Sequence, residues 1–318
     1  MRLIGYLLPR IAIALVTTLG VSILVFLALR FIPGGYADIL LGPFVTPEAR
    51  AAIAQRYGLD QPIVFQFGRW LLSLLQGDFG VSMVTRKPVI DEFLRRAPVT
   101  LELATIALFV ALALGVPLGI ASGVAGRARG GYARVVGAIG ASVPDVVLGS
   151  ALIFVFSAWS LWFRVGGYVP LSEDPIENLR VMLLPGLTLS VFGVALILRT
   201  TRDAVMQVMT EGHITTAVAR GERPRDIIRL HVLRNAAIPV VTVVTTYFGF
   251  LLSGAVVVEV LFSIPGIGLY TFNGLLNRDY AIVQAGVLIA ALVFISINML
   301  SDILYAAIDP RVGAGKRR

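Results

Sequence analysis

The sequence predicts an all-α, polytopic membrane protein with six transmembrane helices. Of its 318 residues, 57% are hydrophobic and only 14% are charged, whereas a water-soluble domain usually has about 25% charged residues. Six apolar runs are each about as long as the roughly 20 residues that cross a bilayer. The basic residues collect at the ends of these runs, which is typical of membrane topology rather than of nucleic-acid binding.

The expected transmembrane helices are the apolar runs themselves. The first run has an arginine-flanked start like that of a signal peptide, but it is too long for a signal sequence and no small-residue cleavage site follows it. We therefore expect an uncleaved anchor. The six predicted spans are residues 9–31, 101–125, 135–162, 181–198, 236–262 and 282–308.

Lysine and arginine are unevenly distributed among the connecting segments. Arginines lie at the N-terminus, in the loop after the second span and, seven in number, between Arg199 and Arg234. The loops 164–180 and 263–281 lie on the other side and are acidic or poor in basic residues. Because basic loops face the cytoplasm, we expect both termini and the 199–234 region to be cytoplasmic.

Residues 32–96 separate the first span from the second and predict a small helical domain outside the cytoplasm. Two segments in it carry a proline near the start and a glycine at the end, as helices do. The domain would either pack against the membrane face or cap an entrance. The predicted plan is thus a first part, 1–96, a membrane core with five spans, 97–308, and a basic cytoplasmic tail, 309–318.

Small residues and prolines punctuate the spans. Gly115, Gly119 and Gly123 recur at every fourth position, which predicts that the second span packs closely against another helix. Pro117 and Pro144 are places where the helical backbone could break, provided that neighbouring groups satisfy the freed hydrogen bonds.

Three acidic residues within the spans are candidates for the translocation path. Charge is costly at membrane depth and is therefore kept for a reason. Asp145 and Asp302 would either line a polar path or form a buried structural pair. Glu259 lies toward the outer end of its span, where its carboxylate could reach the interface.

A long charged segment, TTAVARGERPRDIIRLHVLRNAAIP, interrupts the hydrophobic chain at residues 215–239. We call it the elbow. Its pattern predicts a short helix, a turn at Gly221 and a second helix that begins at Pro224. Arg225 and Arg229 alternate there with apolar residues, so the elbow should form a rigid cationic knob. Such a knob would fit a socket on a soluble partner, and the alternative is a helix lying on anionic lipid.

The elbow resembles the cytoplasmic coupling loop of binding-protein-dependent ABC importer permeases, described by Glu-Ala-Ala-x-x-x-Gly. At the matching positions the chain has Thr215, Thr216, Ala217 and Gly221, so the alanine and the glycine are kept and the glutamate is absent. The chain also resembles the dipeptide and oligopeptide importer branch from end to end, as a first permease subunit. This likeness rests on LVFLALRFIPGG, GLDQPIVFQF, GDFGVSM, PVTLELA, ASVPDVVLG, LRNAAIPVVT, VVVEVLFSIPGIG, RDYAIVQAGVL and DILYAAIDPR.

The resemblance implies a machine made of several subunits in a bacterial cell membrane. This chain would form a heterodimer with a second, homologous permease, and two ATPase subunits would hold ATP and magnesium. An extracytoplasmic binding protein would deliver the peptide. The elbow would couple ATP hydrolysis to transport through Thr215, Thr216, Ala217, Gly221, Arg225 and Arg229.

The sequence offers no catalytic or metal site of its own. It lacks a phosphate-binding G-x-x-x-x-G-K-[ST] motif, cysteine and a His-Glu-x-x-His motif, so we expect no bound cofactor and no enzymatic activity. His213 and His231 are the only histidines; His231 lies in the elbow and His213 lies two residues before it. The alternatives are a permease of the same branch that carries nickel or a metal chelate, a passive channel and an intramembrane enzyme.

Overall fold

The computed structural model describes residues 2–30, 46, 48, 51, 55, 60–129, 131–159 and 162–308. Within these residues the structure is built from helices, and an isolated bridge pairs Val81 with Pro88. The predicted all-α class is therefore confirmed. The predicted tail, 309–318, and most of the first half of the predicted outer domain lie outside the described residues.

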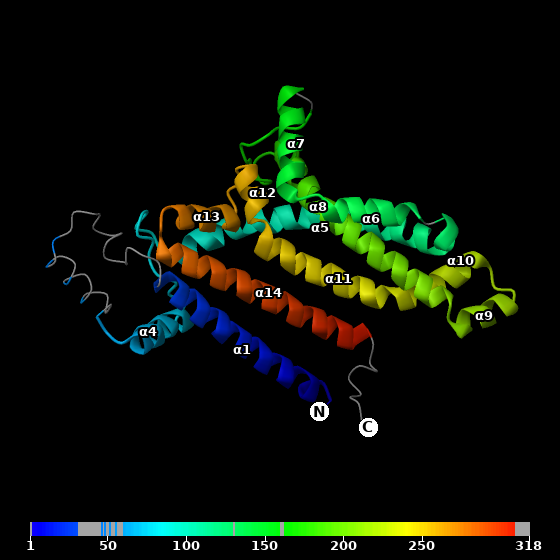
Figure 1. Ribbon diagram of the computed structural model, residues 1–318, viewed down its shortest axis with the longest axis horizontal. Coiled ribbons are helices and arrows are strands. Elements are labelled where there is room, and N and C mark those ends of the chain that lie inside the picture. The colour runs from blue at the N-terminus through cyan, green and yellow to red at the C-terminus, as the bar shows by residue number, and fades with distance from the viewer. Residues whose placement is uncertain are drawn as a thin grey trace.

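Long helices dominate the molecule and lie roughly side by side (Figure 1). The helices are α1 (Arg2–Arg30), α4 (Ile63–Leu75), α5 (Val89–Arg129), α6 (Tyr132–Ser142), α7 (Asp145–Ala158), α8 (Pro175–Met209), α9 (Gly212–Ala219), α10 (Pro224–Asp226), the π-helical segment η1 (Ile227–Val232), α11 (Leu233–Gly254), α12 (Val256–Leu261), α13 (Ile267–Leu276) and α14 (Tyr280–Ile308).

Five helical segments of the described chain are long and apolar enough to cross a membrane, and a bent pair, α6 with α7, makes a sixth if it counts as one span. The five are α1, α5, α8, the continuous run from α10 to α11, and α14. α1 begins and α14 ends at the same end of the molecule as the elbow, and α4 lies at the opposite end (Figure 1). The side of the membrane on which each end lies stays a prediction.

The third predicted span is wrong as a single helix. The predicted range instead contains most of α6 and all of α7, whose axes differ in direction by 90°. The break lies at Val143 and Pro144, which have extended backbone angles (ψ 117° and 140°). Proline cannot donate a helical hydrogen bond, and it pushes the residue before it out of the helical region. Pro117, in contrast, lies within α5, whose backbone leaves the helical region only at Gly126.

The other differences concern where the helices begin and end. α5 begins at Val89 and crosses the predicted boundary at residue 97, with Asp91 and Glu92 in its first turn, where the helix dipole favours acids. α8 begins at Pro175 because the Asp174 carboxylate accepts hydrogen bonds from the N–H groups of Ile176 and Glu177, both 3.0 Å away. The predicted fifth span, 236–262, is divided between α11 and α12.

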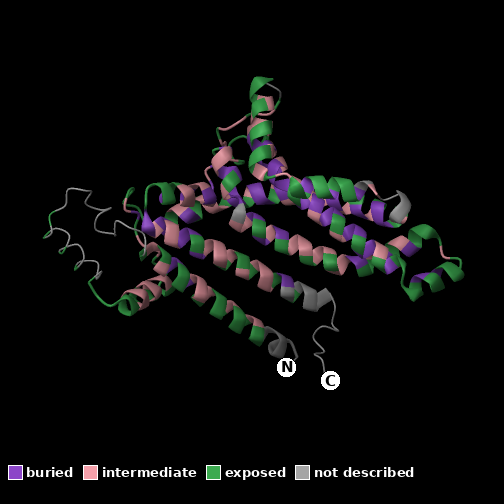
Figure 2. Ribbon diagram, in the orientation of Figure 1, coloured by how far each residue is buried: buried purple, intermediate pink, exposed green. Residues whose placement is uncertain are grey.

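The core lies between α5 and α8. In α8, 67% of the most apolar window is buried, compared with 11% in α1, and Figure 2 shows buried residues concentrated along α5 and α8. The predicted glycine stripe explains their close approach. A Cβ atom at Gly115 would lie 3.0 Å from Ile197, one at Gly119 would lie 2.6 Å from Thr201, and one at Gly123 would lie 2.7 Å from Val205.

Replacing Gly119 with leucine should therefore destabilise the fold. Its Cβ would lie 2.8 Å from the backbone oxygen of Leu198 as well as against Thr201, so α5 and α8 would have to separate. Overpacking of this kind costs about 1–3 kcal/mol or more. The measurement is the melting temperature of the detergent-purified protein, followed by size-exclusion chromatography. Gly20→Leu in α1 is the matched control, because nothing lies within 4 Å of a Cβ there; equal melting temperatures would contradict the packing explanation.

At the end opposite the elbow, a buried carboxylate forms hydrogen bonds that hold the loop before α5 against the turn between α13 and α14. Asp279 is fully buried. It accepts hydrogen bonds from the hydroxyl group of Ser82 at 2.7 Å and from the backbone N–H of Met83 at 2.8 Å. The segment around Ser82 is thereby held on the turn between α13 and α14, close to the packed rings of Phe93 and Tyr270.

Candidate functional site

The turn of the elbow is a helix C-cap built around Gly221. The N–H of Gly221 donates to the carbonyl of Val218 at 2.9 Å, and the N–H of Glu222 donates to the carbonyl of Ala217 at 3.2 Å. This pair of bonds is the Schellman motif, which requires a left-handed residue after the helix. Gly221 has φ +74°, and nothing lies within 4 Å of the place of its missing Cβ. The requirement for glycine is therefore one of backbone conformation, not of space within this chain.

The elbow is packed firmly against the end of α8. Ile214 and Ala217 of α9 are 4% and 3% exposed, and Ile227 and Val232 of η1 are also buried. These four residues form one hydrophobic cluster with residues from the last turns of α8, one of which is Val205. A displacement of the elbow must therefore move α8 and α11 with it, since close-packed interiors transmit strain.

The structure divides the predicted elbow residues into two sets. Thr215, Thr216, Arg225 and Arg229 are exposed, as a contact surface would require. Ala217, in contrast, is buried in the chain's own cluster, so its side chain packs the elbow rather than facing outward.

The predicted apolar ridge of the second helix is also partly buried. Ile227 and Val232 face the cluster with α8, and Leu230 remains 60% exposed. Val218 of α9 is 61% exposed as well. Val218 and Leu230 are thus apolar side chains on the outer surface of a cationic elbow, where a protein partner could cover them.

Both histidines interact with acids of the elbow. The Nε2 of His231 lies 2.9 Å from Oε2 of Glu222, and the Nδ1 of His213 lies 3.2 Å from Oε2 of Glu211. The two imidazole rings are 6.2 Å apart. These contacts join α9 to η1 and the turn, so the histidines stabilise the elbow's shape.

A π-helical segment connects the elbow to α11. Residues Ile227–Val232 form η1, and helical backbone angles continue through Leu233. π-helical turns are rare and occur often at functional sites. The sequence predicts a plain helix here and gives no signal for the wider turn. The π-helical segment contains Arg229 and leads directly into the membrane helix α11.

Asp145 lies at a hollow formed at the break between α6 and α7. The hollow has a volume of about 260 Å³ and is lined by Ala141, Ser142, Val143, Pro144, Asp145, Phe192 and Phe250. Asp145 is half-buried, and no described residue makes a hydrogen bond or ion pair with its carboxylate. It therefore lies at the surface of a cavity, and its place on the translocation path stays a prediction.

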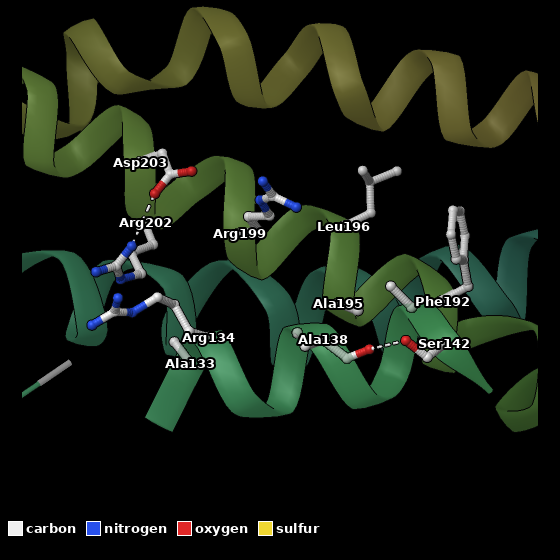
Figure 3. Close-up of a pocket in the computed structure, with 12 residues that line it drawn as sticks. Ala133, Arg134, Ala138, Ser142, Phe192, Ala195, Leu196, Arg199, Arg202 and Asp203 are labelled. Carbon is white, nitrogen blue, oxygen red and sulfur yellow. Dashed lines mark hydrogen bonds and ion pairs between the residues drawn. The ribbon is translucent and has the colours of Figure 1, made fainter. Parts of the chain in front are cut away.

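A second hollow, of about 540 Å³, lies between α6 and α8 (Figure 3). Arg134 comes from α6, and Arg199, Arg202 and Asp203 come from α8. Ala141, Ser142 and Phe192 line this hollow and also the one beside Asp145. The two hollows are thus neighbours. In the sequence alone, these arginines indicate membrane topology and nothing more.

The position of Glu259 near the end of its span would allow its carboxylate to reach the membrane interface. In the structure the carboxylate is instead turned into the protein. Glu259 is 0% exposed and accepts hydrogen bonds from the hydroxyl group of Thr100 at 2.6 Å and from the N–H of Leu269 at 2.9 Å. The hydroxyl oxygen of Thr100 in turn accepts from the N–H of Ile267 at 2.9 Å. We call this network the Glu259 latch, because it joins α5, α12 and the start of α13.

The third acidic candidate, Asp302, belongs to α14, but its side chain lies outside the described part of the structure. Its neighbour Ser301 is buried, with its hydroxyl oxygen 2.6 Å from that of Thr245 on α11. Asp145 lines a hollow and Glu259 is fully buried, and the two side chains are not in contact.

Two family models match the chain. The model for the binding-protein-dependent transport system inner membrane component matches residues 115–314. The model for the N-terminal part of the membrane component of binding-protein-dependent transport systems matches residues 3–104. Together they match residues 3–314 except for positions 105–114, within α5.

Curated relatives match almost the whole chain. A probable peptide ABC transporter permease of Sinorhizobium fredii is 34% identical over 310 residues, covering 96% of this chain and 98% of the relative. A putative peptide transport system permease of Brucella abortus is 35% identical with the same coverage. The glutathione transport permease of Escherichia coli K12 is 36% identical over 311 residues, with coverage of 98% and 99%.

A solved structure has the same fold. A chain of the methionine ABC transporter MetNI matches with a TM-score of 0.55 and 18% identity, covering 69% of this chain and 97% of that one.

Proposed function

Since the chain belongs to the family of inner membrane components of binding-protein-dependent transport systems, we propose that it is the permease subunit of an ABC importer for di- or oligopeptides. The proposal is supported chiefly by the structure of the elbow. It presents exposed cationic and apolar side chains on a turn that is packed rigidly against two spanning helices. Such an element can pass a partner's movement into the membrane.

The partner at the elbow is an ATPase subunit. The sequence has no phosphate-binding motif of its own, so ATP and magnesium are held by two such subunits, and this chain has no enzymatic site. The membrane unit is a heterodimer with a homologous permease, and a binding protein delivers cargo from outside. Both termini and the elbow face the cytoplasm.

The cargo is a peptide. The relatives that match over nearly their full length are named for peptide and glutathione transport, which favours peptide over nickel or a metal chelate. The path runs through the neighbouring hollows beside Asp145 and Phe192. Hollows of this size, open and mostly apolar, suit cargo with varied side chains.

Cross-linking tests the elbow contact directly. The chain has no cysteine, so Thr216→Cys introduces a unique thiol on the exposed face of α9. A bifunctional thiol reagent should join it to a cysteine placed in the cleft of the ATPase subunit, in the assembled complex. Gln76→Cys, exposed at the opposite end of the molecule, should give no product. A Thr216→Cys variant that transports normally and never cross-links would refute the docking.

Asp145→Asn should reduce peptide uptake while the complex still assembles. The substitution keeps the shape of the side chain and removes the charge at the hollow. Loss of one hydrogen bond to a charged group costs about 1.5–3 kcal/mol, which corresponds to about tenfold or more in uptake at limiting peptide. Uptake and ATP hydrolysis in proteoliposomes are the measurements. Unchanged values for both would remove Asp145 from the path.

A further inference from the structure

The hollow between α6 and α8 carries more positive charge than topology requires. Arg134, Arg199 and Arg202 line it, and Asp203 is the acid among its lining residues. Three guanidinium groups and one carboxylate leave two net positive charges. Figure 3 shows that α6 and α8 both contribute arginine side chains, so the charge is brought together by the fold rather than by neighbours in the sequence.

The hydrogen bonding of Arg202 is incomplete. The residue is only 7% exposed. Its Nη1 donates to Oδ1 of Asp203 at 3.0 Å, and its buried Nε has no hydrogen-bond partner in the described structure. An unsatisfied donor on a buried charged group is costly. An oxyanion in the hollow would give the guanidinium groups that line it charge-assisted hydrogen bonds.

The opposite charge lies beside the neighbouring hollow. Phe192 lines both hollows, with Asp145 at the smaller one and Arg199 at the larger one. Phe192 and Arg199 are separated by seven positions of the continuous helix α8, which corresponds to about 10 Å along its axis. An extended peptide of about three residues has that length.

We propose that Arg134, Arg199 and Arg202 form a binding site for the free carboxylate of a short zwitterionic peptide, with Asp145 facing the ammonium end. The proposal rests on the proposed transport function and adds to it a preference for short peptides that have a free carboxylate. A lipid phosphate is a second oxyanion that arginines could bind. The acid at Asp145 favours the peptide, because a lone anionic headgroup leaves that charge without a counterpart.

Arginine footprinting tests the site in the intact complex. The nucleotide-free complex, in nanodiscs of phosphatidylcholine, is treated with phenylglyoxal in the presence of trialanine or of trialanine amide. Modification of Arg134 and Arg199, both exposed, is read by mass spectrometry. Arg234 is the control, since it is exposed and lines neither hollow.

The free acid should slow modification of Arg134 and Arg199 about tenfold at a concentration about tenfold above its dissociation constant. The amide should have no effect, and Arg234 should react equally in all samples. Asp145→Asn should weaken the protection by the acid. Equal protection by acid and amide would overturn the proposal. So would protection that depends on added phosphatidylglycerol and ignores peptide, which would assign the arginines to lipid.

ATP-driven uptake of trialanine by the same wild-type complex separates the two proposals. A complex that transports trialanine without acid-specific protection refutes the carboxylate site alone. A complex that shows acid-specific protection and moves no peptide refutes the transport function, and the oxyanion site remains.

Discussion

Gly221→Val is expected to abolish ATP-coupled transport while the chain still inserts into the membrane and folds. Gly221 has φ +74°, and a β-branched residue with positive φ is a strained outlier. Strain of this kind costs about 1–3 kcal/mol, so the native turn would be populated about five- to 160-fold less. Both hydrogen bonds of the C-cap depend on this turn, and the exposed surface of α9 would no longer be presented to the proposed ATPase partner in the same orientation.

The measurement is peptide uptake together with ATP hydrolysis in proteoliposomes, with gel filtration to show that the complex assembles. Gly212→Val is the matched control. It makes the same chemical change at the start of α9, where nothing lies within 4 Å of a Cβ and φ is not positive. Gly221→Asn should retain much of the activity, because asparagine tolerates the left-handed region. Normal transport by Gly221→Val would refute the role of the turn.

Glu259→Ala is expected to destabilise the fold strongly. The change removes the acceptor for two buried donors, the hydroxyl group of Thr100 and the N–H of Leu269. Each orphaned donor costs about 1–3 kcal/mol, and a cavity forms where the carboxylate lay. A Cβ at Gly266 would contact the Glu259 carboxylate, and one at Gly268 would lie 2.6 Å from Cα of Val256. Gly266 and Gly268 thus leave the space that the Glu259 side chain and its neighbours occupy.

The loss should appear as a lower melting temperature and a lower yield of monodisperse protein. Glu259→Gln keeps one acceptor oxygen and the side-chain shape, so its effect should be intermediate. Glu173→Ala is the control, at an exposed glutamate of the loop before α8, where substitutions change stability by about 0.5 kcal/mol or less. An unchanged melting temperature with loss of uptake would instead place Glu259 in the path.

Local features of the structure could be predicted from the sequence. The glycine before Pro224 predicts the turn of the elbow, because few other residues adopt the left-handed conformation that ends α9. The repeat of Gly115, Gly119 and Gly123 predicts the close packing that they make with α8. Pro144 marks the break between α6 and α7, although the 90° angle between them depends on tertiary packing.

The parts that the sequence does not predict depend on residues far apart in the chain. Thr100 and Glu259 are separated by 159 positions, and Ser82 and Asp279 by 197, so neither partner can be identified from its neighbours. Arg134 lines the same hollow as Arg199 and Arg202 only because α6 packs on α8. The spacing of Arg199 and Arg202, one helical turn apart, is the local signal that a shared face exists.

The most direct test of the central claim is uptake of a labelled short peptide by proteoliposomes that contain this chain, its partner permease, both ATPase subunits and the binding protein. The proposed function predicts accumulation that requires ATP and the binding protein, and that Gly221→Val abolishes. Two results would contradict it: ATP hydrolysis with no accumulation of peptide, or peptide flux through the permeases alone, without any ATPase, as in a passive channel.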